Sequence, residues 1–450
     1  MTEQPALGER LRGLRLAANV TIEALADRSG LSDRAISDIE RGVSEAPQHR
    51  TIAAIAEALG LDEEERRTFL ATARGARVAR RAGAATPRNP SAASSSPEFT
   101  GRERELAKIS ATLTTMTTVA APALLISGAP GVGKTATALE AVSRATAWSS
   151  HLFVDLDGFA ALPATPTQIL RELLRQLPGS TEQIPTTLDD AARHWRMRTE
   201  GDPPLVVLDN AASESQVRPV LSLSPRGAVI VTSRRALAGL EGVARMTLGP
   251  LGEEASIRLL GRLIANGLIA NGLIANGLIA NGRTTPQATV LVAQLVHGLP
   301  LAISIAAEII SNDPNHDAAY FASALGSADD PLAALVHGDR SVASAIALSY
   351  DTLSARSAQL LRDISVIETD TFDAILAGAI GVEQGGVESR LDELADLGLL
   401  EVRGGDRFSL PWPVRHFALA RLTDTVGPRG VAERRQRADV WLRANGAAAH

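Results

Sequence analysis

A glycine-rich segment beginning at Gly128 fills every fixed position of the phosphate-binding loop pattern, and its residues read GAPGVGKT. It follows the apolar run ALLIS and precedes the helical stretch TATALEAV, the strand and helix that this motif requires on either side. The glycines let backbone N–H groups turn inward around phosphates, and the N-terminus of the following helix favours negative charge. We therefore predict a site for ATP or ADP with contacts from Gly128, Gly131, Val132, Gly133, Lys134, Thr135 and Ala136.

The residues around Asp209 and Asn210 indicate whether this site would bind Mg²⁺ and hydrolyse its nucleotide. Lys134 is expected to reach the terminal phosphates, while Thr135 and Asp209, which ends the strand-like run LVVLD, would hold Mg²⁺. The alternative for Asp209 is an ordinary aspartate at a strand end. Asn210 stands where many ATPases place a second acid, and an amide cannot accept a proton from water. We expect at most slow ATP hydrolysis, which argues against a plain, fast ATPase.

A pair of arginines follows the next apolar run, VIVTS. Arg234 or Arg235 could direct a guanidinium at the γ-phosphate and report its presence, the alternative being two solvated surface arginines. The chain has 45 Lys and Arg, of which only Lys108 and Lys134 are lysines, so Lys134 is an informative exception. The predicted catalytic group is Lys134, Asp209 and Arg234.

The elements that must position these residues are short apolar runs alternating with helical stretches. Besides ALLIS these runs are HLFVDL, PLVVLD and AVIVTS, and continuous Val, Ile and Leu segments separated by helices predict a parallel sheet covered on both faces. After about residue 250 we expect the strands to stop and helices to follow, up to a hairpin at Gly404-Gly405.

One segment is of low complexity, because LIANG occurs four times in tandem from Leu263 to Gly282. Five residues advance a helix by about 500°, so successive copies rotate by about 140° and cannot keep one apolar stripe. Each Asn-Gly pair also weakens a helix by roughly 1 kcal/mol or more. The repeat is interpreted as tolerated length variation in a helix-to-loop region or, alternatively, as an oligomerisation surface.

The first 75 residues have the pattern of a small helical DNA-binding domain. In TIEALADRSGLSDRAISDIERG, a helix over 21–28, a turn at 29–31 and a helix over 32–41 have helix-turn-helix length. Ser32 would be the N-cap of the second helix, and its core would be Leu25, Ala26, Leu31, Ile36 and Ile39. The residues predicted to face DNA are Ser32, Asp33, Arg34, Ser37 and Arg41. The alternative is a helical protein-interaction module.

Charge limits how strongly this domain can bind. Residues 1–75 hold 10 Arg and 13 Asp or Glu, so one copy should bind double-stranded DNA weakly. Two half-sites on one DNA multiply a weak affinity, so nucleotide-driven self-association could switch binding on. Residues 76–97 lose apolar periodicity and are predicted to be a flexible linker, whose arginines could add phosphate contacts or simply keep it solvated.

Composition narrows the class of protein. The chain has 450 residues, no cysteine and a net charge of −6, which excludes disulfides, thiolate metal sites and a uniformly basic surface. No apolar run reaches the roughly 18 residues that span a bilayer, and the N-terminus lacks the apolar core of a secretory signal. We expect a protein of a reducing cytoplasm with no membrane partner.

Five motifs in order, FTGRERELAKI, GAPGVGKT, LVVLDN, VTSRR and GLPLA, resemble the NB-ARC class of the STAND signal-transducing NTPases over about residues 98–424. The resemblance implies that Gly101 and Arg102 lie near the adenosine, that Pro300 packs on the purine, and that Arg234 senses the γ-phosphate. The N-terminal segment resembles the Xre-type helix-turn-helix. The combination of this module with an NB-ARC domain is typical of actinobacterial regulators, which implies a bacterial cytoplasmic protein that is associated with the nucleoid when bound to DNA.

The resemblance also implies a winged helix in which a His locks the ADP state. In RFSLPWPVRHFALARL, Pro411 falls at that position, which casts doubt on the usual lock, although Arg415 or His416 lies nearby.

The predicted fold is multidomain. Its parts are an all-α helix-turn-helix, an α/β P-loop NTPase domain with a parallel sheet, a helical subdomain and a winged helix. Their ranges, with the linker and a C-terminal helical tail, are 1–75, 76–97, 98–250, 251–335, 336–425 and 426–450. The predicted function is an ATP/ADP-dependent switch on a DNA-binding transcriptional regulator, with a possible sensor partner in trans. The alternative is a defence-type signalling NTPase.

Overall fold

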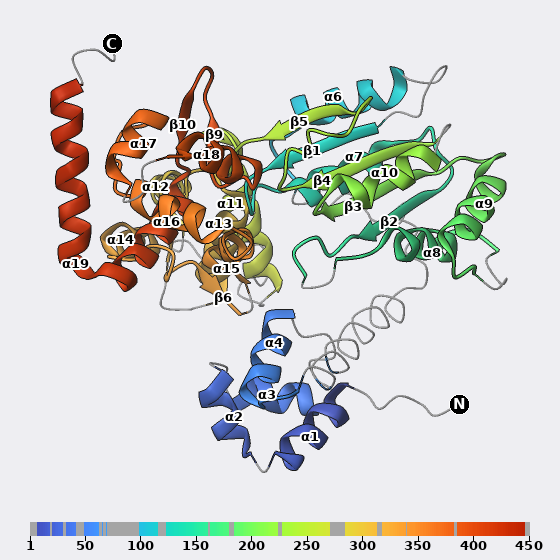
Figure 1. The fold of residues 1–450 in the computed structure, drawn as a ribbon, viewed down its shortest axis with the longest axis horizontal. Coiled ribbons are helices and arrows are strands. Elements are labelled where there is room, and N and C mark those ends of the chain that lie inside the picture. The colour runs from blue at the N-terminus through green and yellow to red at the C-terminus, as the bar shows by residue number, and fades with distance from the viewer. Residues whose placement is uncertain are drawn as a thin grey trace. The chain divides into compact units, whose positions relative to one another are not determined.

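The computed structural model divides into two compact units, residues 1–88 and 89–450, shown in Figure 1. It describes residues 7–445 apart from gaps at 19, 30–32, 42–48, 63–64, 66–68, 70–98, 116–122, 161–162, 180–183, 224–226, 271–283, 313–316, 339 and 382–384. The predicted linker, Leu31 and Ser32 lie outside the described residues. Among the described helices, none has both the length and the apolarity needed to cross a bilayer.

The N-terminal unit contains the predicted pair of helices. Its helices are α1 (Leu7–Ala17), α2 (Ile22–Ser29), α3 (Asp33–Glu40) and α4 (His49–Ala58). Helices α2 and α3 agree with the predicted ranges to within one residue at each end. The apolar residues assigned to the core are buried where they are described: Leu25, Ala26, Ile36 and Ile39.

A buried ion pair fastens α1 to the end of α3. The guanidinium of Arg15 donates from Nε to Glu40 Oε1 at 2.6 Å and from Nη2 to Glu40 Oε2 at 2.9 Å, and the carboxylate raises the pKa of Arg15. The helices also meet at Gly8, where an added Cβ would lie 2.5 Å from the carbonyl oxygen of Ile39. The contact fixes α1 against the helix predicted to face DNA.

Arg15→Ala should destabilise the N-terminal unit by about 3 kcal/mol, because it leaves the Glu40 carboxylate buried without its partner. The measurement is urea unfolding of residues 1–88, a segment that forms its own compact unit, followed by circular dichroism. Arg41→Ala is the control, since Arg41 follows α3, is exposed, and its Nε donates to the nearby Ser37 carbonyl oxygen at 3.4 Å. Equal midpoints for the two variants would contradict the role assigned to the pair.

The second unit is built on a five-stranded sheet in the order β2-β3-β4-β1-β5, with every neighbouring pair parallel. Its strands are β1 (Ala123–Gly128), β2 (His151–Asp155), β3 (Leu205–Ala211), β4 (Ala228–Ser233) and β5 (Ala244–Leu248). Four were predicted. The edge strand β5 was missed because only one of its residues is buried, so it lacks a continuous apolar run.

Helices cover both faces of the sheet, as predicted (Figure 1). On one face, α6 (Glu103–Thr115) and α7 (Lys134–Arg144) pack on Leu124, Ile126 and Val207. On the other, α8 (Pro166–Gln176), α9 (Leu188–Thr199) and α10 (Glu214–Leu223) pack on the alternate residues, such as Leu125 and Val206. Alternation along each strand thus assigns every side chain to one of two cores.

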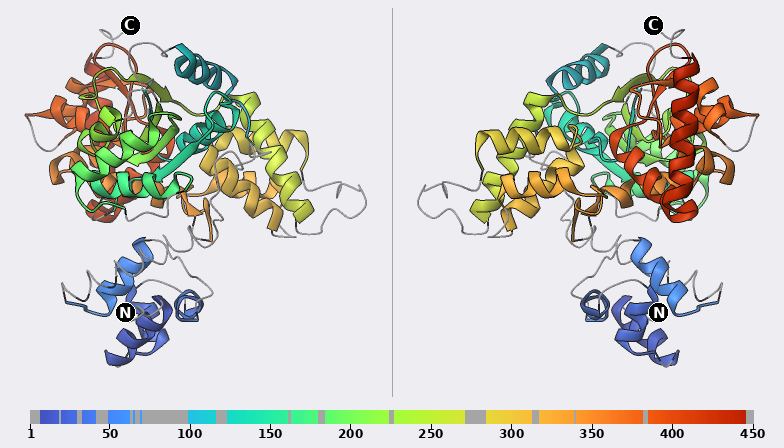
Figure 2. Two further views of the ribbon diagram at one scale, coloured as in Figure 1. Left: turned by 90° about the vertical axis from the view of Figure 1, so that its right-hand side faces the viewer. Right: turned by 90° about the vertical axis from the view of Figure 1, so that its left-hand side faces the viewer.

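A helical bundle follows the sheet, gathered apart from the C-terminal helices in Figure 2. It contains α11 (Glu253–Ala270), α12 (Pro286–Leu295), α13 (Pro300–Asn312) and α14 (Ala318–Ser327). Helix α11 continues through the first LIANG copy into the second. Ile264 faces the core from the first copy and Leu268 from the second, so different repeat positions are buried, as the rotation of the repeat requires.

The C-terminal region has the arrangement of a winged helix. Helices α15 (Val342–Tyr350), α16 (Ala355–Ile364), α17 (Ala374–Ile380) and α18 (Val387–Asp396) accompany an antiparallel sheet of β8 (Phe372–Asp373), β10 (Arg407–Ser409) and β9 (Glu401–Val402). The predicted hairpin at Gly404-Gly405 joins β9 to β10.

The final helix, α19 (Trp412–Asn445), breaks at Gly427, whose φ is 70°. The expectation that strands stop after residue 250 is wrong. Besides the winged-helix strands, β6 (Val336–His337) pairs with β7 (Arg340–Ser341), and two-residue strands are too short to leave a pattern in the sequence.

Candidate functional site

The phosphate-binding loop lies between β1 and α7 in the geometry that its motif requires. Gly128, Gly131 and Gly133 have φ of 146°, 78° and 92°, values that L side chains rarely adopt. Helix α7 begins at Lys134. The Lys134 Nζ donates to the carbonyl oxygens of Gly128 and Ala129 at 2.8 and 2.9 Å, so the ammonium spans the loop it belongs to.

Lys134 is buried enough for its charge to be costly. Burial, with the charge of Arg234 added, lowers the pKa of Lys134 to about 7. Phosphate groups beside the ammonium would favour its charged form and raise that pKa again. Above about pH 7, nucleotide binding would therefore be accompanied by protonation of Lys134. Below pH 7, Lys134 is already protonated before the nucleotide binds.

ATP affinity should consequently fall as pH rises from 7 to 9, by up to about tenfold per unit of pH. Equilibrium titration with a fluorescent ATP analogue across this range checks it. In Lys134→Arg the cation stays charged throughout, so this variant should show a flat profile whatever its absolute affinity. A wild-type profile as flat as that of the arginine variant would contradict the shift.

Asp209 and Thr135 are brought together at the carboxyl end of β3. Thr135 Oγ1 donates to Asp209 Oδ1 at 2.8 Å, and Thr232 Oγ1 donates to the same oxygen at 2.5 Å. Burial raises the pKa of Asp209, and the charge of Asp155 adds to the rise. These oxygens are the hard donors that Mg²⁺ prefers, and a magnesium site needs only one or two protein groups besides phosphates. No cluster of three His, Cys, Asp or Glu occurs among the described residues.

Two of the three residues assigned to the adenosine side lie against the phosphate-binding loop. Arg102 is buried and donates from Nη2 to the carbonyl oxygens of Val132 and Gly249 at 3.2 and 2.6 Å. Gly101 packs so closely that an added Cβ would lie 2.3 Å from Ala255 Cβ. Pro300 Cγ lies 3.8 Å from where a Cβ of Gly133 would stand. Arg102 and Pro300 thus lie at the phosphate-binding loop, whereas Gly101 packs on α11, and Arg102 here bonds to the backbone and to Glu105.

Arg234 is half-buried and bonded to a distant helix. Its Nη1 donates to the carbonyl oxygen of Ala345 at 2.7 Å and to Ser349 Oγ at 2.8 Å, both on α15, and its guanidinium lies 4.3 Å from the centre of the Phe159 ring. Burial lowers the pKa of Arg234 to about 10, so it stays charged near pH 7. The interpretation of solvated surface arginines is wrong, because this residue joins the sheet to the winged-helix region.

The neighbouring arginine makes a parallel connection. Arg235 Nη1 pairs with Asp396 Oδ2 at 3.2 Å, and the backbone N–H of Ala236 donates to Asp396 Oδ1 at 3.1 Å. Two residues further on, Gly398 has φ of 67°, and a Cβ there would lie 3.2 Å from the Gly128 carbonyl oxygen. The end of α18 therefore rests directly on the phosphate-binding loop.

The residues near the position of the family's histidine form an aromatic stack. Trp412 stacks on His297 with ring centres 5.1 Å apart, and His416 meets Trp412 edge-on at 5.4 Å. Burial lowers the pKa of both histidines. His297 immediately precedes GLPLA, so this stack joins the helical bundle to α19.

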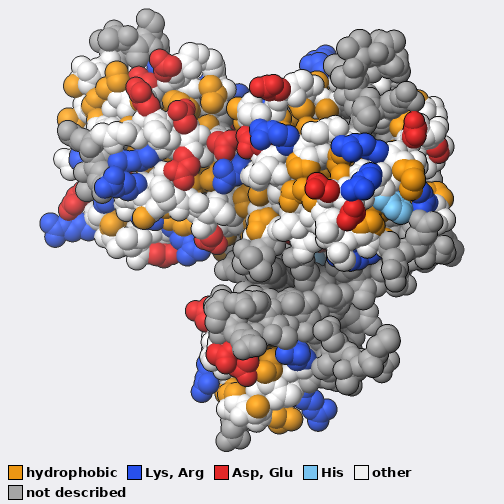
Figure 3. Space-filling view, turned by 45° about the vertical axis from the view of Figure 1, so that its right-hand side comes forward, with side chains coloured by type: hydrophobic (Ala, Val, Ile, Leu, Met, Phe, Trp, Pro, Cys, Tyr) orange, Lys and Arg blue, Asp and Glu red, His pale blue; other side chains and the backbone are white. Residues whose placement is uncertain are grey.

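The predicted DNA-contacting residues are described in part. Asp33, Arg34 and Ser37 lie on α3, with Ser37 half-buried and the side chains of Asp33 and Arg34 outside the described set. Arg41 follows the helix and is exposed. In the face of the molecule shown in Figure 3, acidic and basic side chains are interspersed, in keeping with the 45 Lys and Arg and 51 Asp and Glu of the whole chain.

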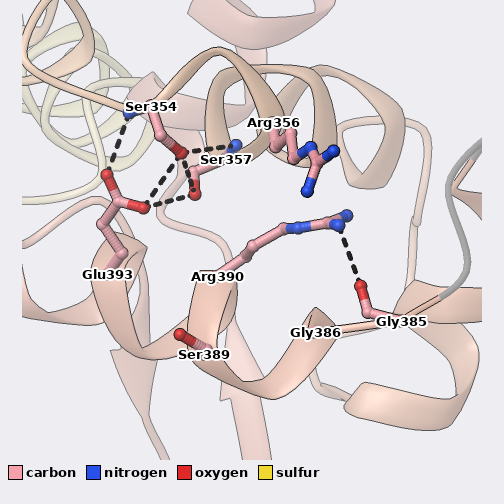
Figure 4. A pocket seen from close by; sticks show the side chains of 8 residues that line it. All are labelled: Ser354, Arg356, Ser357, Gly385, Gly386, Ser389, Arg390 and Glu393. Atoms are coloured by element: carbon pink, nitrogen blue, oxygen red, sulfur yellow. Dashed lines mark hydrogen bonds between the residues drawn. The ribbon is translucent and has the colours of Figure 1, made fainter.

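A cavity of about 650 Å³ opens between α16 and α18, and none of its lining residues belongs to the phosphate-binding loop (Figure 4). Glu393 accepts from the Ser354 backbone N–H at 3.0 Å and from Ser357 Oγ at 2.5 Å, and Arg390 donates to the Gly385 carbonyl oxygen at 2.8 Å. These bonds tie the start of α16 to α18. We assign the nucleotide to the motif-bearing loop, since this cavity has neither the glycine cradle nor a strand end.

Sequence reasoning missed several residues that the structure adds to the site: Asp155, Phe159, Thr232, Ser349, Asp396 and Gly398. Thr232 belongs to the VTSRR segment and could have been found from its place two residues before Arg234. The contacts of Ser349 and Asp396 join residues more than 100 positions apart, for which no local signal exists.

Comparisons with known proteins match two parts of this chain to known domain families. The helix-turn-helix domain family matches residues 6–69, and the AAA ATPase domain family matches residues 98–263. Two curated relatives, each a "Regulatory protein AfsR", come from Streptomyces griseus and Streptomyces coelicolor. Each is 28% identical to this chain, over 327 and 331 residues respectively. The match covers 72% of this chain, which spans about a third (32%) of each relative.

Among solved structures, the Walker-type ATPase paby2304 of Pyrococcus abyssi is similar with a TM-score of 0.49 and 15% identity, over 71% of this chain and 95% of that one. The domain matches rest on separate parts of the sequence and fall on the two units of the structure. This chain is therefore a protein in which an N-terminal helix-turn-helix domain precedes a P-loop ATPase domain.

Proposed function

We propose that this chain is a transcriptional regulator whose DNA binding is controlled by the ATP or ADP held at the phosphate-binding loop. The observation that carries the proposal is the position of Arg234. One guanidinium next to the phosphate-binding lysine also bonds to Ala345 and Ser349 of α15. A γ-phosphate would compete with α15 for this group, so nucleotide state and domain packing share a side chain.

The remaining site residues have roles in the same switch. Lys134 would neutralise the terminal phosphates, while Thr135 and Asp209 would hold Mg²⁺, which supplies further positive charge to those phosphates. A ligand shifts a conformational equilibrium only by its difference in affinity for the two states. ATP and ADP differ by the γ-phosphate, and the group that distinguishes them is Arg234.

DNA binding would follow from self-association. The helix-turn-helix domain has an acidic balance, so a single copy would bind a half-site weakly, and release of α15 and α18 would expose surfaces through which copies assemble. The relatives' name as regulatory proteins supports this reading. We further propose that a partner protein acts as the sensor in trans. The proposed domains end at residues 75, 97, 250, 335 and 425.

The test is to measure DNA binding with ATP and with ADP, in the wild type and in Lys134→Ala, at fixed salt. We expect a protected operator at one or a few promoters whose affinity differs at least tenfold between the nucleotides in the wild type only. Nucleotide released from the purified protein on denaturation identifies the resting ligand. Equal affinities with ATP and ADP would remove the basis of the switch. Binding without sequence preference would favour the defence-type signalling NTPase instead.

A further inference from the structure

Asp155, which the sequence pattern did not single out, lies at the carboxyl end of β2 next to the predicted magnesium ligand. It is in register with Asp209 across the parallel pair β2 and β3. Residues in register on neighbouring parallel strands project from the same face of the sheet. Asp155 and Asp209 therefore form a pair of carboxylates on one face.

The apolar cores identify that face. Phe153 and Val207, each two residues before an aspartate, pack with α6 and α7, whereas Leu152 and Val154 pack with the helices on the opposite side. By alternation Asp155 is on the α7 side, where Thr135, in the first turn of α7, donates to Asp209. The contribution of Asp155 to the raised pKa of Asp209 places the two within electrostatic range.

Backbone contacts hold Asp155 in place. The N–H of Asp157 donates to Asp155 Oδ1 at 3.0 Å. The N–H groups of Leu156 and Gly158 donate to the carbonyl oxygens of Asp209 and Asn210 at 2.8 and 3.0 Å. A Cβ on Gly158 would lie 2.2 Å from the latter oxygen, so only glycine permits this approach. The loop after β2 is thus held against the end of β3. In the same loop, the ring of Phe159 lies under the guanidinium of Arg234.

Asn210 stands where many ATPases place a second acid, and its side-chain amide cannot accept a proton from water. Its backbone is left-handed, with φ of 60°, and its N–H donates to Thr232 Oγ1 at 3.0 Å. Asp155 is the carboxylate that the fold brings to the same strand ends from a neighbouring strand. A base must lie within hydrogen-bond reach of its water, either directly or through one further water.

We propose that Asp155 orients the water that attacks the γ-phosphate and accepts its proton; this inference rests on the proposed nucleotide site. The water oxygen forms a bond to the γ-phosphorus, and the bond from that phosphorus to the oxygen bridging the β-phosphate breaks. ADP leaves with the bonding electrons, inorganic phosphate forms, and the proton passes to the Asp155 carboxylate and then to solvent. Slow hydrolysis would return the switch to its ADP state.

Asp155→Asn is the test, because it preserves shape and removes the base. Single-turnover hydrolysis of ATP should slow at least about 100-fold, the range of general-base catalysis. ATP affinity should stay within about threefold of the wild type. In addition, protein purified from cells should carry ATP where the wild type carries ADP, a result read by chromatography of released nucleotide. Asp155→Asn with Asn210→Asp restores an acid at the strand ends and should recover at least about tenfold of the lost rate.

Asp202→Asn is the matched control, since Asp202 bonds to Ser149 at 2.5 Å before β2 and β3 begin, at the opposite edge of the same strands. It should hydrolyse ATP as the wild type does. Wild-type hydrolysis that is undetectable, or an Asp155→Asn rate within threefold of the wild type, would overturn the inference and leave the switch intact. Loss of ATP binding in Asp155→Asn alone would overturn it in favour of a binding role. Failure of the wild type to bind any nucleotide would instead remove the proposed function.

Discussion

Arg234→Ala is expected to lower the affinity for ATP by about 10- to 100-fold while changing the affinity for ADP by less than about threefold. Hydrogen bonds to charged groups contribute about 1.5–3 kcal/mol each, and only ATP has a γ-phosphate to receive them. Arg234 is half-buried and within electrostatic range of Lys134, so solvent screens its charge less than it would at an exposed site. Competition titrations of both nucleotides against a fluorescent analogue measure the two affinities.

Arg235→Ala is the matched control for this experiment. Arg235 follows Arg234 directly, but its pair with Asp396 is about one-third exposed on both sides, and such pairs contribute about 0–1 kcal/mol. Its loss should leave the preference between ATP and ADP unchanged. If Arg234→Ala weakened both nucleotides equally, the arginine would be a structural contact to α15 and no sensor of the γ-phosphate.

Gly398→Ala should accelerate the release of ADP by about tenfold. The new methyl group would lie 3.2 Å from the Gly128 carbonyl oxygen and 3.3 Å from Ala129 Cα, so the end of α18 must withdraw from the phosphate-binding loop. Withdrawal also strains the bond from Ala236 to Asp396, which closes the same side of the site. Displacement of a fluorescent ADP analogue by excess unlabelled ADP gives the rate.

The backbone cost of that substitution can be separated from the contact. Gly405 has φ of 56°, close to the 67° of Gly398, yet a Cβ at Gly405 would meet nothing within 4 Å. Each alanine should therefore cost about 1 kcal/mol of left-handed strain, while only the one at Gly398 touches the loop. If Gly405→Ala released ADP as quickly as Gly398→Ala, general destabilisation would account for the effect.

The sequence by itself determined the elements whose information is local. The phosphate-binding loop follows from consecutive residues, because its glycines, Lys134 and Thr135 act within one turn of chain. Four of the five strands follow from unbroken apolar runs, since a strand covered by helices on both faces carries apolar side chains on both. Helices α2 and α3 follow from helical spacing and the turn between them. Asp209 could be assigned because it ends an apolar strand, and the carboxyl ends of parallel strands all lie at the same edge of the sheet as the phosphate-binding loop.

Only the tertiary structure decided how the site is closed and which acid stands beside Asp209. The bonds from Arg234 to α15 and from Arg235 to Asp396 cross more than 100 residues, and they depend on how separately folded parts pack. Asp155 became a neighbour of Asp209 through the order and register of strands, whereas its sequence context marks it only as a strand end. Side-chain roles that depend on register or domain packing are set by three-dimensional contacts, because local pattern fixes the type of an element but not its neighbours.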